Sequence, residues 1–419
     1  MKLLLLILGC VSCAAAADLV KHVTDHPEGD VAYSFEAAAY HGDLAGLPIG
    51  VFDSGIGGLT VLEAILSVDH FNNDTLQPKA DGKPDFANER FIYFGDQANM
   101  PYGNYPAAER TDYLRELILK DAVFLLGRRW FDPFSGGFKY DKPPVKAIVI
   151  ACNTATAYGI DALREALKKW QVPVFVVGVV EAGARGVQEA HREGAVGILA
   201  TVGTCASGAY PRVIASTLGL AGRPVPAISQ QGSPSLAGVI EGDPSFKESL
   251  SDQCAQDARA LLSEHQKNHP GTALSTLVLG CTHFPLVQNE LRRALLEIGQ
   301  QDAFRGLILP DFNFVNPAEW TARELFMSLA KARLRNKADS RFTDAFYLSI
   351  PNPNRADLRL TSDGGLEKDF KYGRSPGDMQ REDTVNVPMS RNRIPPVSRN
   401  LIETKLPEVW KRLAQLPSQ

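Results

Sequence analysis

The sequence predicts an α/β protein whose sheets are mostly parallel and covered by helices on both faces. Segments of strand and helix character alternate along the chain, an order typical of parallel sheets. The expected strands are nearly continuous apolar runs, as strands are when both faces of a sheet are buried. One strand–Cys–helix unit also occurs twice: residues 148–154 read IVIACNT and residues 277–283 read LVLGCTH, and an amphipathic helix follows each. Two such units facing across a cleft would place a thiol on either side of a ligand.

The bulk composition is that of a soluble globular protein. The chain has 419 residues, enough for two or three domains, of which 44% are hydrophobic and 22% charged. The formal net charge of -4 gives no support for a nucleic-acid partner.

Residues 1–17 have the features of a secretory signal peptide. A charged start precedes an apolar run at 3–8, and small residues at 14–17 form a cleavage site of the Ala-x-Ala type. The apolar run is too short to span a membrane. We expect cleavage near Ala16 or Ala17, and therefore a periplasmic or secreted mature protein.

Two further expectations concern this end of the chain. A lipid anchor at Cys10 or Cys13 is an alternative that the residues before each cysteine fit less well. Residues 18–46 are polar and mixed, and we expect them to form a loose leader.

Ordered structure is expected to begin at Leu47. Apolar runs predict strands at 49–52, 91–94, 148–150, 174–180, 196–200 and 276–280. Amphipathic spacing predicts helices that include 59–66, 161–167, 289–295 and 407–416. Two stretches, 69–89 and 130–144, have the composition of insertions on connections. The tail at 351–419 is expected to be irregular, apart from its last helix, and contains no recognisable chemistry.

Several polar or reactive residues follow directly after expected strands. In open parallel sheets the ligand lies beyond the carboxyl ends of the strands. The residues in this position are Asp53, Tyr102, Cys152, Thr204 and Cys281. This coincidence predicts that they share one site.

A pair of thiols suits the removal of a proton next to a carboxylate. The pKa of a free thiol is about 8.5, and cations or helix N-termini lower it. One cysteine as thiolate and the other as thiol would form a matched acid/base pair near neutral pH. His283 could tune the thiol of Cys281; the alternative is a structural histidine at a strand end.

Other cysteine chemistries fit the sequence less well. The Cys-x-x-Cys spacing of a disulfide oxidoreductase occurs only at Cys10 and Cys13, inside the expected signal. The remaining cysteines and His283 lack compact metal-ligand spacing, so we expect no metal site. A cysteine hydrolase needs one cysteine and would leave the second unexplained. Cys205 and Cys254 are expected to be structural thiols.

The loop at 53–58 reads DSGIGG and is the only glycine-rich segment that suggests a cofactor. It lacks the third glycine of the dinucleotide pattern and the Lys-Ser/Thr of the Walker pattern. Asp53, at the start of the loop, could bind an ammonium group or orient the partner of a thiol. The alternative is that it only caps the following helix. We therefore expect no cofactor.

Taken together, these motifs resemble bacterial glutamate racemases of the cofactor-independent aspartate/glutamate racemase superfamily. The matching segments are 49–62, Gly95-Asp96, 101–103, 151–155, Gly203-Thr204 and 279–286, in the family's order. The resemblance covers roughly residues 47–350. It implies two similar doubly wound α/β domains with the active site in the cleft between them. The first domain would comprise 47–174 plus 305–350, the second 175–304, and 351–419 would be a C-terminal extension.

The resemblance also implies roles for individual residues. Cys152 and Cys281 would be the two catalytic acid/bases, assisted by Asp53, His283 and, by a looser match, Glu241. The implied substrate binders are Asp53, Ser54, Tyr102, Gly103, Asn153, Thr154, Thr204, Thr282 and His283. The implied ligand is glutamate, and a homodimer is the expected assembly.

The expected function is therefore interconversion of L- and D-glutamate. Two alternatives stay open: an aspartate racemase of the same superfamily, and a periplasmic binding protein for acidic amino acids with the same fold. Intact Cys152 and Cys281 argue against pure binding, which needs no thiols. The family normally acts in the cytoplasm and supplies D-glutamate for cell-wall precursors, so an export signal departs from its pattern.

Overall fold

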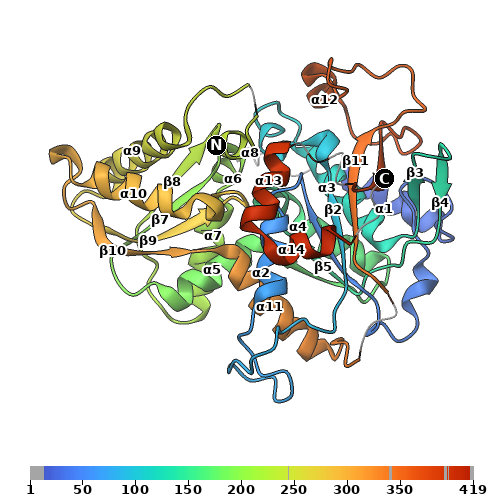
Figure 1. Cartoon of the computed structure of the whole chain (residues 1–419), viewed down its shortest axis with the longest axis horizontal. Helices are drawn as coiled ribbons and strands as arrows, with labels where there is room; N and C mark the ends of the chain where they lie inside the picture. The colour runs from blue at the N-terminus through green and yellow to red at the C-terminus, as the bar shows by residue number, and fades with distance from the viewer. Residues whose placement is uncertain (1–13, 244, 339–341, 391–393, 395, 416–419) are drawn as a thin grey trace, which may run out of the picture.

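The computed structural model describes residues 14–243, 245–338, 342–390, 394 and 396–415. Its strands form a six-stranded sheet, a four-stranded sheet and a two-stranded hairpin. The two larger sheets occupy opposite halves of the molecule (Figure 1). All neighbours within them run parallel except β11 and β12. This is the predicted α/β class.

The first sheet has the order β12-β11-β2-β1-β5-β6. Its strands are β1 (Ile49–Asp53), β2 (Phe91–Gly95), β5 (Ala147–Ile150), β6 (Phe175–Gly178), β11 (Ala345–Pro351) and β12 (Thr384–Pro388). Every residue of β1, β2 and β5 is buried. The unbroken apolar runs at these positions therefore correctly predicted strands that are covered on both faces of the sheet.

Alternate residues of these strands enter different cores. Ile148 and Ile150 pack with helices α1 (Ala14–Asp25), α3 (Thr111–Leu126) and α4 (Asn153–Lys169). Ala147 and Val149 face the other core, formed with α2 (Leu59–Ser67), α11 (Pro317–Ala332), α13 (Pro396–Lys405) and α14 (Pro407–Leu413). The period of two in a strand explains this division.

The second sheet has the order β10-β9-β7-β8. Its strands are β7 (Ala195–Thr201), β8 (Ile228–Ser233), β9 (Leu274–Gly280) and β10 (Ile308–Val315). Helices α5 (Val179–Ala190) and α7 (Ala209–Leu220) share one of its cores. Helices α9 (Leu250–Asn268) and α10 (Gln288–Gly299) share the other. Because β10 pairs with β9, the chain returns to the first half after Val315 and not at 305 as expected.

The segment at 18–46, expected to be loose, is packed against the first half. Leu19 and Val23 of α1 are buried beside α3 and α4. The indole Nε1 of Trp170 donates to the carbonyl of Val20 at 3.2 Å, and the hydroxyl of Tyr40 donates to the carbonyl of Leu126 at 3.0 Å. The sequence reading missed this helix because few apolar residues carry its packing. Most of the expected signal, 1–13, lies outside the described residues.

The tail at 351–419, expected to be irregular, also contributes to the core. Strand β12 extends the first sheet antiparallel to β11, and its Val385 and Val387 are buried. Helices α13 and α14 bury Ile402 and Val409 against the first half. Leu401, next in the chain to Ile402, packs instead against the core of the second half. The last helix ends at Leu413, three residues short of the expected 407–416.

The two expected insertions differ in structure. Residues 130–144 contain an antiparallel hairpin of β3 (Trp130–Asp132) and β4 (Gly137–Lys139). Residues 69–89 form loops in which backbone amides donate hydrogen bonds to the side-chain carboxylates of Asp69, Asp81 and Asp85. Over the described part of the chain, each helix is too short or too polar to cross a membrane.

Candidate active site

The carboxyl ends of the two sheets border one cleft of about 830 Å³. Both cysteines of the repeated unit line it: Cys152 two residues after the end of β5 and Cys281 directly after β9. The other predicted site residues that line it are Asp53, Ser54, Tyr102, Gly103, Asn153, Thr154, Glu241, Thr282 and His283. Parallel strands bring their carboxyl ends to the same edge, so residues far apart in sequence meet there.

Cys152 lies in an acidic and closely packed environment. It is the N-cap of α4, where its Sγ accepts from the amide of Ala155 at 3.4 Å. Its thiol donates to the hydroxyl of Ser54 at 3.8 Å. Burial, followed by the charge of Asp53, raises the pKa of Cys152 above its usual value. Cys152 is therefore a protonated thiol in the free protein near neutral pH.

Asp53 is held by the loop that follows it. Its carboxylate accepts from the amides of Gly58 at 2.9 Å and Gly55 at 3.3 Å. Burial raises the pKa of Asp53, while the charge of His283 and the loop amides oppose that rise. A Cβ at Gly57 would lie 2.3 Å from Cε1 of His283, so glycine permits the loop to approach the histidine.

Cys281 has a different partner set. Its Sγ lies 3.7 Å from Nδ1 of His283, and Nε2 of His283 lies 2.7 Å from Oε1 of Glu241. Burial lowers the pKa of His283, but the Glu241 carboxylate and Cys281 outweigh it and raise the pKa well above its usual value. The resulting imidazolium donates to the carboxylate through Nε2–H. Its Nδ1–H faces the sulfur and can stabilise negative charge there.

Glu241 reaches this histidine from the end of α8 (Leu236–Glu241). The helix stops at Gly242, which has a left-handed φ of 71°. Gly242 also packs against Val397 of α13 so closely that a Cβ would lie 2.6 Å from Val397 Cγ1. Glycine at this position therefore satisfies both the turn and the close contact.

Three threonines connect the halves behind the cleft. Thr204 is buried and does not line the cleft; its Oγ1 lies 3.1 Å from Oγ1 of Thr154. It also accepts from the hydroxyl of Thr201 at 2.9 Å. Thr201 lines the cleft and was not predicted. It ends β7 one turn before Thr204, so this loop reaches the cleft through Thr201, and the contact of Thr204 with the substrate stays a prediction.

Tyr102 and Asn153 line the cleft, but their polar side-chain atoms are engaged elsewhere. The hydroxyl of Tyr102 lies 2.5 Å from Oδ2 of Asp96 and 2.7 Å from Oδ2 of Asp121. Burial, followed by the charge of Asp96, raises the pKa of Asp121 well above its usual value. Oδ1 of Asn153 accepts from the hydroxyl of Tyr210 at 2.6 Å. These hydrogen bonds hold the side chains of Tyr102 and Asn153 in the walls of the cleft.

The C-terminal extension supplies cleft residues that the sequence analysis missed entirely. They are Thr361, Leu366, Lys368, Lys371 and Tyr372. The three residues nearest the chain's end lie on α12 (Lys368–Gly373), at the upper right of Figure 1. The sequence analysis looked for polar residues that follow a parallel strand. These residues were missed because no parallel strand directly precedes their segment.

All four described cysteines are free thiols. Cys254 is buried and Cys205 half-buried, and neither lines the cleft. Within the described ranges, no group of three or more His, Cys, Asp or Glu residues is arranged to hold a metal ion. The ionisable groups that line the cleft include Cys152, Cys281, Asp53, Glu241 and His283, together with Asp243, Lys368 and Lys371.

Known proteins are similar to this chain in sequence. The glutamate racemase of Limosilactobacillus fermentum is 34% identical over 251 residues, which are 59% of this chain and 72% of the relative. This chain belongs to the glutamate racemase family. The glutamate racemase of Thermus thermophilus is 33% identical over 289 residues, which are 69% of this chain and 82% of the relative. Membership of the family makes the protein an amino-acid racemase, and hence an isomerase.

Two further comparisons agree with this family. The model of the Asp/Glu/Hydantoin racemase family matches residues 137–303, a range that contains both cleft cysteines. The crystal structure of a glutamate racemase isoform from Bacillus anthracis superposes with a TM-score of 0.51 at 26% identity. The match covers 72% of this chain and 86% of the other. The α/β fold and the family thus follow from independent comparisons.

Proposed function

We propose that the protein interconverts L- and D-glutamate by a two-base mechanism in which Cys152 and Cys281 act on opposite faces of the substrate's α-carbon. The observation that carries this proposal is the placement of both thiols in one cleft, Cys152 near the Asp53 carboxylate and Cys281 beside His283, which contacts Glu241. The curated relatives are glutamate racemases, which supports glutamate as the substrate.

The two thiols need opposite protonation states for each turnover. One sulfur, as thiolate, takes the α-proton from one face, and the other sulfur, as thiol, gives a proton to the opposite face. After turnover the two sulfurs have exchanged states, which prepares the site for the reverse reaction. In the free protein burial and Asp53 favour the protonated form of Cys152, while the sulfur of Cys281 lies 3.7 Å from Nδ1 of the His283 imidazolium.

The remaining polar groups suit the charges of an amino acid. Asp53 offers a carboxylate for the ammonium group. The start of α4, a helix of 17 residues, presents backbone amides and the positive end of its dipole, which favours a carboxylate. Ser54, Thr154 and Thr282 line the same cleft and add hydroxyl groups.

A single experiment separates this function from its rivals. The purified protein is incubated separately with L-glutamate and L-aspartate in ²H₂O, without added cofactor, and the products are resolved by chiral chromatography. We expect D-glutamate carrying deuterium at the α-carbon, and EDTA should leave the rate unchanged. Product from aspartate alone would identify an aspartate racemase, and binding without exchange would identify a binding protein. Loss of activity in EDTA that a metal restores would contradict the thiol mechanism.

The location and assembly of the protein stay predictions. We propose an exported enzyme that is cleaved near Ala16 or Ala17, on the basis of the N-terminal sequence. A role in supplying D-glutamate for peptidoglycan rests on the family alone, and so does the homodimer. N-terminal sequencing of the native protein tests the cleavage, since a chain that begins at Met1 would exclude it. Light scattering on the purified protein tests the dimer.

A further inference from the structure

The substrate-binding loop and the C-terminal extension meet at one edge of the cleft. The loop at 97–104 contains two short 3₁₀ turns, η2 (Gln97–Asn99) and η3 (Tyr102–Asn104). Turns of this length make few internal hydrogen bonds, so their position depends on groups outside them. Helix α12 lies beside this loop and lines the same cleft.

Two neighbouring side chains of α12 hold the loop by its backbone. The ammonium of Lys371 donates to the carbonyl of Met100 at 2.7 Å. The hydroxyl of Tyr372 donates to the carbonyl of Pro101 at 3.3 Å, and it accepts from Nδ2 of Asn104 at 3.3 Å. These contacts bracket Tyr102 and Gly103, the two predicted substrate binders of the loop.

A third contact reaches the start of the loop. The guanidinium of Arg374 donates to Oδ1 of Asn99. Nδ2 of Asn99 donates in turn to both oxygens of Asp96, at 2.8 and 2.9 Å. Asp96 is the buried carboxylate against the hydroxyl of Tyr102. The extension is therefore connected to Tyr102 from both ends of the loop.

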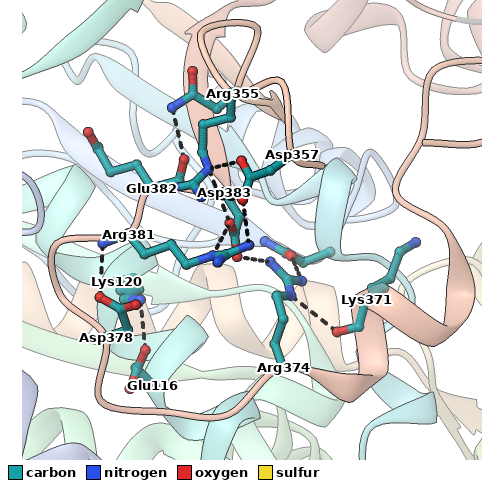
Figure 2. A network of polar contacts seen from close by, with 12 residues as sticks. Glu116, Lys120, Arg355, Asp357, Lys371, Arg374, Asp378, Arg381, Glu382 and Asp383 are labelled. Atoms are coloured by element: carbon teal, nitrogen blue, oxygen red, sulfur yellow. Dashed lines mark hydrogen bonds and ion pairs between the residues drawn. The ribbon is translucent and has the colours of Figure 1, made fainter. Parts of the chain in front are cut away.

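The part of the extension that contains α12 is held in place by a network of ion pairs. Figure 2 shows Arg374 and Arg381 converging on Asp383, with Lys371 at the other side of Arg374. Nη1 of Arg374 lies 3.8 Å from Asp383, and Nε of Arg381 lies 2.7 Å from it. Asp383 directly precedes β12, which belongs to the first sheet. The residues that contact the loop are thus linked by ion pairs to the end of a strand of the first sheet.

We propose that α12 is a fixed wall of the substrate cleft and that Lys371 and Tyr372 are positioning residues, which hold loop 100–104 in the geometry that binds the amino acid. This inference deepens the proposed function and rests on it for the identity of the substrate. The position of the loop itself does not depend on that identity.

The test uses the full chain with Lys371→Met and Tyr372→Phe. Each removes a hydrogen bond to the loop, and we expect KM for glutamate to rise by about 2- to 10-fold with a smaller change in kcat. Hydrogen exchange of peptides covering 97–105 should become faster in both variants. Lys371→Arg, which keeps a cationic donor, should restore most of both properties. Lys405→Met, an exposed residue of α13, is the matched control and should change neither.

The outcomes distinguish this inference from the proposed function. Unchanged exchange at 97–105 in both variants would overturn the inference, even if the enzyme racemises glutamate. Faster exchange in a protein that does not racemise glutamate would support the inference and reject the proposed function. Tyr372→Phe removes one oxygen atom only, so it keeps the test valid if Lys371→Met unfolds; melting temperatures identify that case.

Discussion

The two halves of the cleft present the same strand–Cys–helix unit in different electrostatic surroundings. On the first half, Cys152 lies against the Asp53 carboxylate, and both burial and that charge favour its protonated form. On the second half, Cys281 lies against an imidazolium that Glu241 keeps charged. Similar backbone geometry therefore places one sulfur beside a carboxylate and the other beside an imidazolium. The repeated unit thus gives two cysteines with unlike electrostatic surroundings.

The largest expected effect comes from removing either thiol. Cys152→Ser and Cys281→Ser each replace a thiol by a far weaker acid, so glutamate racemisation should fall by at least about 10²–10⁴-fold. Each variant keeps one sulfur, so it should still eliminate a leaving group from a substrate analogue of one handedness, and the two should prefer opposite enantiomers. Chiral analysis of the remaining analogue measures this preference.

The matched controls are the two cysteines outside the cleft. Cys205→Ser and Cys254→Ser should retain near-normal racemisation, although Cys254→Ser places a hydroxyl in a buried position and can lower stability. Normal racemisation by Cys152→Ser would reject the two-thiol mechanism for this protein.

A smaller effect should follow from neutralising the carboxylate of the second half. Glu241→Gln removes the charge that raises the pKa of His283, so that pKa should fall and the imidazolium should lose its proton at lower pH. We expect kcat at pH 8 to drop by about 10-fold, the scale of one charged hydrogen bond. The alkaline limb of the pH–rate profile should move to lower pH. An unmoved limb would show that Glu241 does not control this histidine.

The buried carboxylates of the first half should affect stability more than rate. The folded-state pKa of Asp121 is raised, so the folded protein retains a proton that the unfolded chain releases above about pH 4. This group's contribution is greatest at low pH, and it is lost as pH rises toward the folded-state pKa. In Asp121→Asn that dependence should disappear, which reduces the change in unfolding free energy between pH 5 and 8 by on the order of 1 kcal/mol. Urea unfolding at the two pH values measures this change; an unchanged difference would show that Asp121 does not hold the retained proton.

The smallest effect should come from one of the hydrogen bonds between the halves. The hydroxyl of Thr60 on α2 donates to the carbonyl of Thr282 at 2.8 Å. Thr60→Val keeps the shape and leaves that carbonyl without this donor, so unfolding should become easier by about 1 kcal/mol. Activity should change by less than about 3-fold, because neither sulfur is touched. Thermal unfolding and steady-state kinetics provide the two measurements, and Thr60→Ser is the control that keeps the hydroxyl.

The sequence alone predicted the parts of the site that parallel strands deliver. Asp53, Cys152 and Cys281 could be found because each lies at the end of an apolar run. Parallel strands bring such ends to the same edge of a sheet. His283 and Thr282 followed from their place beside Cys281. These predictions needed only local sequence and one rule of topology.

The parts that were missed depend on contacts between distant segments. Asp121 lies within α3 among apolar neighbours, where a buried carboxylate is costly, and that contrast was the available signal. Its partner Tyr102 is nineteen positions away on another element. Lys371 and Tyr372 reach the cleft from 271 residues further along the chain than the carbonyls they contact. Neither hydrophobic periodicity nor motif spacing can predict contacts between residues so far apart in the sequence.

Helix α13 has a mechanical consequence for how the cleft opens. Leu401 packs against the core of the second half, and Ile402 packs against the core of the first. These residues are joined by one peptide bond, so the two cores cannot separate at this point without breaking one of the contacts. An opening motion that keeps both contacts must be a rotation whose axis passes close to α13.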